Sequence, residues 1–209
     1  MSLFCRSLYR KNTERLLMAE DHGEPDQVPI SLPVLAPFFT RFVEVTFWDY
    51  HSDPRVMLNS QLAARNRFYE ITSIFPDYFP YADVISALGG ELVWPKNDCC
   101  WAKPLVKEPE DVDKLKVPDP FHDGLMPTVL ATYRYMEAKV GDVVDMPGTC
   151  GPFDIAAVLR GIPQFLADLR LNPNLAHKLL NKVTESLIEY FRAKESIVGE
   201  FYRIWLGED

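Results

Sequence analysis

The chain has 209 residues, of which 47% are hydrophobic and 25% charged, so it can bury a sizeable core in one domain or at most two. Its formal net charge of −8 argues against non-specific binding to nucleic acid, which needs clustered Lys and Arg. No apolar run approaches the length of a membrane span, and the N-terminus lacks the long apolar region of a signal peptide. We therefore expect a soluble, cytoplasmic protein that binds neither nucleic acid nor membrane.

In the first half of the chain, local signals predict short elements joined by long irregular connections. Asp53 followed by Pro54, for example, is typical of a helix cap and first turn. The expected elements are helices over residues 13–21, 53–71 and 108–115, a helical turn at 84–88, and short extended or strand segments at 28–34 and 91–94. Residues 35–50 are rich in aromatic side chains, which could line a pocket, pack as a lid or form an oligomer contact.

The second half carries the clearer periodic signals. An amphipathic helix is expected from Pro127 to Val140, followed by a buried strand over residues 143–146. A Gly-rich turn and further helical pieces come next, and Pro173 opens the longest helix, which runs to about residue 197. The buried row expected on this helix is Leu175, Leu179, Val183, Leu187 and Phe191, with Leu180 and Ile188 beside it. A last strand is expected over residues 201–206.

The turn after the predicted strand 143–146 carries the candidate site residues. In α/β folds, ligands bind in the turns after the carboxyl ends of strands. Thr149, Cys150, Phe153 and Asp154 occupy this turn and are our candidate substrate-binding residues. The alternative is that the glycines only make the turn, that Phe153 fills the core and that Cys150 is a small turn residue.

The four cysteines, Cys5, Cys99, Cys100 and Cys150, show no spacing typical of structural zinc, so reduced thiols are expected and no metal ligand is assigned. Strands alternate with long helical crossovers, a pattern that predicts a parallel sheet, either open or closed into a barrel. The chain has no Gly-rich motif of the dinucleotide-binding or P-loop type.

Four segments together resemble the uroporphyrinogen decarboxylase superfamily. Residues 15–30 (RLLMAEDHGEPDQVPI) resemble its opening helix, Gly-Glu-Pro turn and entry into the first strand. Residues 103–120 (KPLVKEPEDVDKLKVPDP) look like its Pro-Glu-Asp and Pro-Asp-Pro segment, and residues 151–190 are similar to its Gly-Pro-Phe helix and the long helix that follows. Residues 204–209 (IWLGED) look like the strand that ends in acidic residues at the barrel rim.

One segment separates this chain from the decarboxylases of the superfamily. They carry Met-Arg-Gln-Ala-Gly-Arg after the first strand, and its arginines hold the carboxylates of the substrate. Residues 32–42 here read LPVLAPFFTRF, with Arg41 as the lone cation. Because carboxylate recognition favours bidentate Arg, the resemblance is closer to the cobalamin-dependent methyltransferases. It implies methyl transfer between a small-molecule donor or acceptor and a corrinoid protein, which carries the cobalamin.

The resemblance also implies how the chemistry is distributed. In the thiol-using members, a zinc ion bound by His and Cys activates the acceptor. Those ligands lie in the later half of the family fold, so zinc would bind through residues not present in this chain. Glu208 and Asp209 would lie at the rim of the last strand and are the candidate catalytic residues. The alternative for these two residues is a frayed acidic terminus.

The expected fold is an incomplete (β/α)8 TIM barrel, about half of it, with parallel strands and extra N-terminal helices, in a single domain over residues 1–209. A full barrel needs roughly 250 residues. Exposed strand edges invite pairing, so a half-barrel would need a second chain, a homodimer or a rearranged fold. The alternative is that the reading frame is truncated and the remaining strands follow in a longer one. Two other functions stay open: decarboxylation of a uroporphyrinogen-like tetrapyrrole, and a non-catalytic half-barrel subunit that needs a partner chain.

Overall fold

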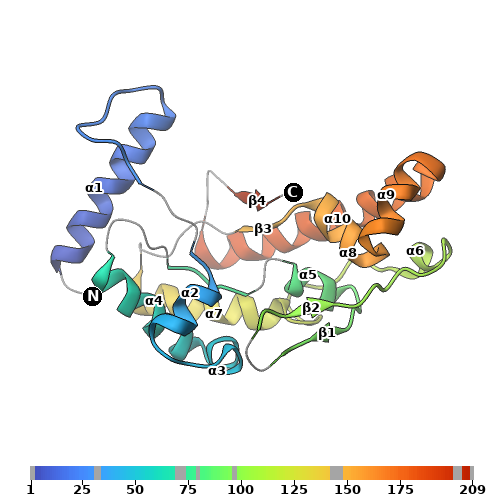
Figure 1. The fold of residues 1–209 in the computed structure, drawn as a ribbon, viewed down its shortest axis with the longest axis horizontal. Coiled ribbons are helices and arrows are strands. Elements are labelled where there is room, and N and C mark those ends of the chain that lie inside the picture. Colours follow the sequence, from blue (N-terminus) through green and yellow to red (C-terminus); the bar gives the residue numbers. More distant parts are fainter. Residues whose placement is uncertain are drawn as a thin grey trace. The chain divides into compact units, whose positions relative to one another are not determined.

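The computed structural model describes residues 3–30, 34–68, 74–78, 81–95, 98–141, 148–199 and 204–207. Figure 1 labels its elements in chain order. The chain divides into two compact units. The first comprises Met1–Asp77 and Met136–Asp145, and the second comprises Tyr78–Tyr135 and Met146–Asp209. Helix α7 (Met126–Val140) therefore contributes residues to both. The expectation of a single domain over residues 1–209 stays a prediction.

The described part of the first unit is helical. Its helices are α1 (Leu3–Glu20), α2 (Ala36–Phe42), α3 (Phe47–Ser52) and α4 (Pro54–Arg67). Helix α4 begins as predicted, because the Asp53 carboxylate accepts the backbone N–H of Arg55 at 2.8 Å and Pro54 occupies the first turn. Helix α1 begins ten residues before the predicted residue 13.

The aromatic stretch over residues 35–50 forms α2 and α3, which the sequence did not predict. The buried rings of Phe39 and Tyr50 stack with their centroids 6.1 Å apart. Phe38 and Phe42, one turn apart on α2, stack at 5.8 Å. These contacts lie within the first unit, so internal packing accounts for the four rings.

The described part of the second unit contains short strands and longer helices. The elements are α5 (Ala82–Ala87), β1 (Leu92–Val93), β2 (Trp101–Ala102), α6 (Asp111–Lys114), β3 (Gly148–Cys150), α8 (Pro152–Arg160), α9 (Ile162–Leu171), α10 (Pro173–Val198) and β4 (Trp205–Gly207). None of the helices within the described ranges of either unit is both long and apolar enough to cross a membrane.

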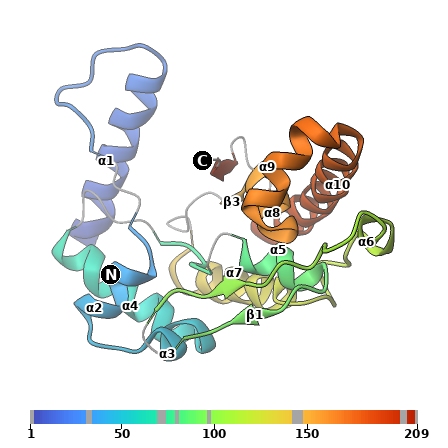
Figure 2. The same cartoon turned by 45° about the vertical axis from the view of Figure 1, so that its right-hand side comes forward.

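The strands form two separate pairs. Strands β1 and β2 are antiparallel, with Leu92 opposite Ala102. Figure 2 labels β1 in its view of the ribbon. Strands β3 and β4 are parallel, with Thr149 opposite Leu206. The predicted strand at 91–94 is therefore real but does not belong to a parallel sheet, because its partner runs in the opposite direction. The predicted strand at 143–146 lies outside the described residues, as do residues 31–33 of the segment 28–34.

Parallel strands need a long crossover connection between them. Between β3 and β4 this crossover contains α8, α9 and α10. Helix α10 begins at Pro173, as predicted, and its predicted row from Leu175 to Phe191 is buried. Ile188, expected beside this row, is instead 47% exposed. Helices α8 and α9 are separated by Gly161, whose φ of 88° favours glycine.

Gly124, in the loop before α7, makes a close backbone contact that can be tested. Its φ is 55°, and a Cβ atom there would lie 2.3 Å from the backbone nitrogen of Ala87. Gly89 has a φ of 93° but no atom within 4 Å of its Cβ position, so it provides a matched control. We expect Gly124→Ala to lower the free energy of unfolding by roughly 1–3 kcal/mol more than Gly89→Ala does in urea denaturation. Equal losses would contradict the contact.

Candidate functional site

The β3–α8 corner, residues 149–154, is formed differently from the prediction. Residues 148–150, predicted as part of a Gly-rich turn, form β3, because they pair with β4. The backbone N–H of Gly151 donates to the carbonyl oxygen of Gly207 at 2.7 Å and continues this ladder. Helix α8 then begins at Pro152, as predicted. The corner thus includes the carboxyl end of a parallel strand and the start of the helix that follows, where α/β folds bind ligands.

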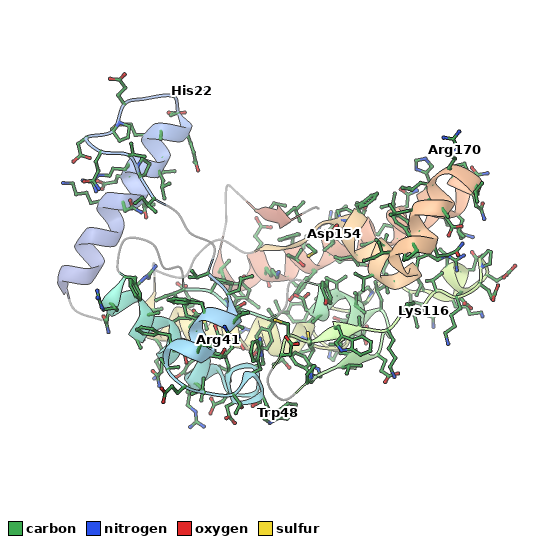
Figure 3. All side chains as sticks on the ribbon, in the orientation of Figure 1. His22, Arg41, Trp48, Lys116, Asp154 and Arg170 are labelled. Atoms are coloured by element: carbon green, nitrogen blue, oxygen red, sulfur yellow. The ribbon has the colours of Figure 1, made fainter. Side chains whose placement is uncertain are left out.

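Two of the four candidate side chains lie on α8. The Phe153 ring packs edge-on against Phe165 of α9, with centroids 5.3 Å apart and an interplanar angle of 71°. This contact fits the alternative in which Phe153 fills the core. Asp154 lies in the first turn of α8 (Figure 3), where the helix dipole favours a carboxylate.

The other two candidates lie on β3. Thr149 is buried, at 1% exposure, and Cys150 is half-buried. None of the four predicted substrate-binding residues lines the apolar groove between α10 and β4. This groove therefore does not bring them together, and their role stays a prediction. The candidate catalytic residues Glu208 and Asp209 lie outside the described residues.

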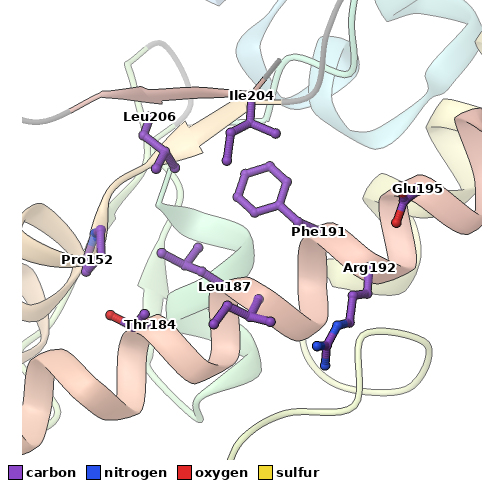
Figure 4. A pocket seen from close by; sticks show the side chains of 9 residues that line it. Pro152, Thr184, Leu187, Phe191, Arg192, Glu195, Ile204 and Leu206 are labelled. Carbon is purple, nitrogen blue, oxygen red and sulfur yellow. The ribbon is translucent and has the colours of Figure 1, made fainter. Parts of the chain in front are cut away.

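An apolar groove of about 340 Å³ lies between α10 and β4 (Figure 4). Ile204 and Leu206 approach it from the end of the chain, and the corner contributes only Pro152. The remaining lining residues come from α10 and are Thr184, Leu187, Ile188, Phe191, Arg192 and Glu195. Ile188 is exposed because it lines this open groove.

Three buried titratable side chains lie close to β3, and the sequence analysis did not identify them. Asp83 at the start of α5 and Tyr190 and Lys194 on α10 are 5%, 0% and 1% exposed. Burial raises the pKa of Asp83, and the charge of Lys194 and the neighbouring Tyr190 hydroxyl oppose that rise. Burial lowers the pKa of Lys194 to about 8, against the opposing charge of Asp83. Burial and the neighbouring Asp83 raise the pKa of Tyr190.

The Lys194 ammonium group has a defined set of contacts. It donates a hydrogen bond to the carbonyl oxygen of Gly148, the first residue of β3, at 3.2 Å. Its nitrogen lies 4.0 Å from the ring centroid of Tyr190, 5.0 Å from that of Phe191 and 5.9 Å from that of Tyr133. A sequence signal existed for this arrangement, because Lys194 continues the predicted buried row by one further helical step after Phe191.

Three thiols gather near a second phenol, that of Tyr81. The Tyr81 hydroxyl donates to the carbonyl oxygen of Cys100 at 3.1 Å. Burial, together with the charges that Cys100, Cys150 and Cys99 would carry as thiolates, raises the pKa of Tyr81 to about 12. Burial also raises the pKa of Cys100 to about 12, which makes it a poor nucleophile at neutral pH.

The first unit holds a separate buried carboxyl group. Asp77 is 3% exposed, and its carboxyl oxygen accepts the hydroxyl of Tyr50 at 3.0 Å. The Gln61 amide in turn donates to the Tyr50 oxygen at 2.9 Å. Burial raises the pKa of Asp77 to about 7, although the hydrogen bonds with Tyr50 and the backbone of Ala36 oppose this rise.

The family resemblance places any zinc on residues that are not present in this chain. Among the residues that the structure describes, no group of three or more His, Cys, Asp or Glu side chains is arranged to hold a metal ion. The lone cation of the segment 32–42, Arg41, is an exposed residue in the last turn of α2 (Figure 3). The described part of this segment is thus an aromatic helix instead of an arginine-lined anion site.

Comparison with known proteins identifies the family. The uroporphyrinogen decarboxylase (URO-D) family model matches residues 11–194. The chain belongs to the URO-D family. A uroporphyrinogen decarboxylase of Myxococcus xanthus (strain DK1622) is 34% identical over an alignment of 113 residues that covers 49% of this chain and 32% of that protein. The superfamily expected from the sequence is therefore confirmed.

The solved structures include a methyltransferase from Methanosarcina mazei that matches with a TM-score of 0.71 at 24% identity. The match covers 89% of this chain and 56% of the methyltransferase. At this identity the likeness shows that the two proteins share a fold. The URO-D chain described here thus spans about a third of the curated relative and little more than half of the solved structure.

Proposed function

We propose that the protein catalyses methyl transfer between a small-molecule methyl donor or acceptor and a corrinoid protein, and that this chain supplies about half of the (β/α)8 barrel. The observation that carries the proposal is the residue content of α2. Phe38, Phe39 and Phe42 pack among aromatic rings, and Arg41 is exposed. A tetrapyrrole with several carboxylates needs bidentate cations at this place, and the segment 32–42 offers one.

The residues of this chain would form the substrate side of the site. Thr149, Cys150, Phe153 and Asp154 would lie beside the substrate at the end of β3, with Glu208 and Asp209 at the barrel rim. Cobalamin would arrive on the partner protein and supply the methyl-carrying cobalt. Zinc, where a thiol is the acceptor, would stabilise the thiolate through residues outside this chain.

A second candidate function is tetrapyrrole decarboxylation, which the 34% identity to the Myxococcus decarboxylase favours. A third is a non-catalytic half-barrel subunit, with a partner chain or a second copy completing the barrel. The exposed apolar groove between α10 and β4 favours this third reading.

The deciding experiment assays the full-length gene product in two reactions. With a methylated corrinoid, zinc and a thiol, we expect loss of the methyl–cobalt absorbance, and with uroporphyrinogen we expect no turnover. The variant Arg41→Ala separates the functions further, because methyl transfer should be unchanged whereas decarboxylation would fall if Arg41 held a carboxylate. Turnover of uroporphyrinogen, or no turnover in either reaction, would overturn the proposal.

A further inference from the structure

The groove between α10 and β4 leaves a nonpolar strip of the second unit uncovered. Of its lining residues, Leu187 and Phe191 are buried, whereas Ile188, Ile204 and Leu206 are exposed. Ile204 and Leu206 alternate along the chain and therefore point to the same side, toward α10 (Figure 4). Large apolar side chains that share one groove are typical of a surface that another protein covers.

The charges on α10 change sign across Ile188. Glu185 lies three residues before Ile188 and Arg192 lies four residues after it, so the three side chains share one stripe of the helix. The side chains of Glu185 and Arg192 are 59% and 68% exposed. The rise of an α-helix places them about 4.5 and 6 Å from Ile188 along the axis, in opposite directions. The stripe is therefore acidic, then apolar, then basic along the chain.

A second copy of this chain offers the complementary order of charges when its α10 lies antiparallel. With the two Ile188 side chains next to each other, Glu185 of each copy lies close to Arg192 of the other, as a two-fold axis requires. A parallel copy would instead place like charges together, which is repulsive. Arg192 already donates to Glu189 at 2.6 Å, but a guanidinium has five N–H donors and can bind a second carboxylate.

We propose that the groove between α10 and β4 is a homodimer interface. In this dimer, α10 packs antiparallel against α10 of a second copy, and the Ile188 side chain of each copy enters the groove of the other. The apolar lining provides the contact area, and the pairs between Glu185 and Arg192 set the direction of the two helices. A two-fold contact closes on itself, so it gives dimers and no longer assemblies. The dimer does not depend on which reaction the protein catalyses.

The association state of the 209-residue chain, measured by light scattering and analytical ultracentrifugation, tests this interface. We expect a monomer–dimer equilibrium with the dimer populated at concentrations on the order of 100 μM, because the contact is small. Ile188→Asp should raise the dissociation constant of the dimer at least about 30-fold, since each groove would receive a carboxylate. Ile162→Asp is the matched control, because Ile162 is 55% exposed on α9 and does not line the groove. This control should dimerise like the wild type.

Exchanging the two charges tests the antiparallel direction. Glu185→Arg or Arg192→Glu alone places like charges together and should each weaken the dimer about tenfold. The double variant Glu185→Arg/Arg192→Glu restores opposite charges and should return the dissociation constant to within about threefold of the wild type. These positions are exposed, so the exchange decides the matter even if Ile188→Asp does not fold.

Four results would each overturn the proposal. The first is a wild-type chain that stays monomeric, which would leave the groove to a different occupant, and the second is open-ended association. The third is an Ile188→Asp variant that dimerises like the wild type. The fourth is a double charge variant that dimerises no better than the two single variants.

Discussion

Replacing Arg160 with methionine is expected to lower the free energy of unfolding by about 3–5 kcal/mol, because the change breaks a buried ion pair. Arg160 and Asp168 side chains are each 8% exposed, and Nε lies 2.7 Å from Oδ2. The same guanidinium donates to the carbonyl oxygens of Val106, at 3.1 Å, and Lys107. A single side chain thus ties α8 to α9 and to the segment before α6. Urea denaturation measures the loss.

An exposed ion pair gives the control for this prediction. On α10, Nη1 of Arg192 lies 2.6 Å from Oε1 of Glu189, but the two side chains are 68% and 45% exposed. Arg192→Met should therefore change stability by less than about 1 kcal/mol. If Arg160→Met cost no more than this control, the buried pair would not have the stabilising role given to it here.

Replacing Asp77 with asparagine is expected to make the protein more stable than the wild type at pH 8. Burial raises the pKa of Asp77 from an ordinary 3.8 to about 7 in the folded state, so the folded protein binds more protons than the unfolded chain between these values. Wild-type stability should therefore fall as pH rises from about 4 to 7, by an amount of the order of 4 kcal/mol. Asparagine keeps an acceptor for Tyr50 but cannot ionise.

The measurement is the stability difference between Asp77→Asn and the wild type, from urea denaturation at several pH values. The difference should grow in favour of the variant as pH rises, and a difference independent of pH would contradict the prediction. Asp53 gives a control of opposite sign, since Arg55 holds the pKa of Asp53 below its ordinary value. The ionised Asp53 carboxylate stabilises the wild type above about pH 4, and this contribution is lost as pH falls. Asp53→Asn should therefore remove a weak decrease in stability at acidic pH.

The features that the sequence predicted best depend on local chemistry. Asp53 with Pro54, Pro152 and Pro173 each begin a helix because a side-chain cap or a fixed φ acts within one turn. The buried row of α10 followed from periodicity alone. Residues 148–150 were predicted wrongly because their turn-like composition is overridden by pairing with β4, which is distant in the sequence.

The candidate site was predictable only in part for the same reason. The order of the elements predicted that the candidate residues lie near the end of a strand. The structure places two of them, Thr149 and Cys150, on β3. To predict the cluster of Asp83, Tyr190 and Lys194, one would have to know that α5 lies near α10. No local sequence pattern contains this information. A lysine on a helix is usually solvated. The only sequence signal that Lys194 is buried was therefore its place in the buried row.

The groove between α10 and β4 also affects how the isolated chain behaves in solution. Ile188, Ile204 and Leu206 present a nonpolar strip to water, at 47%, 42% and 42% exposure. Sulfate and phosphate salts are excluded from protein surfaces, and they therefore strengthen the attraction between nonpolar strips. Self-association of purified material should accordingly increase with these salts, so dilute preparations in weakly salting-out buffers are the appropriate starting point for handling it.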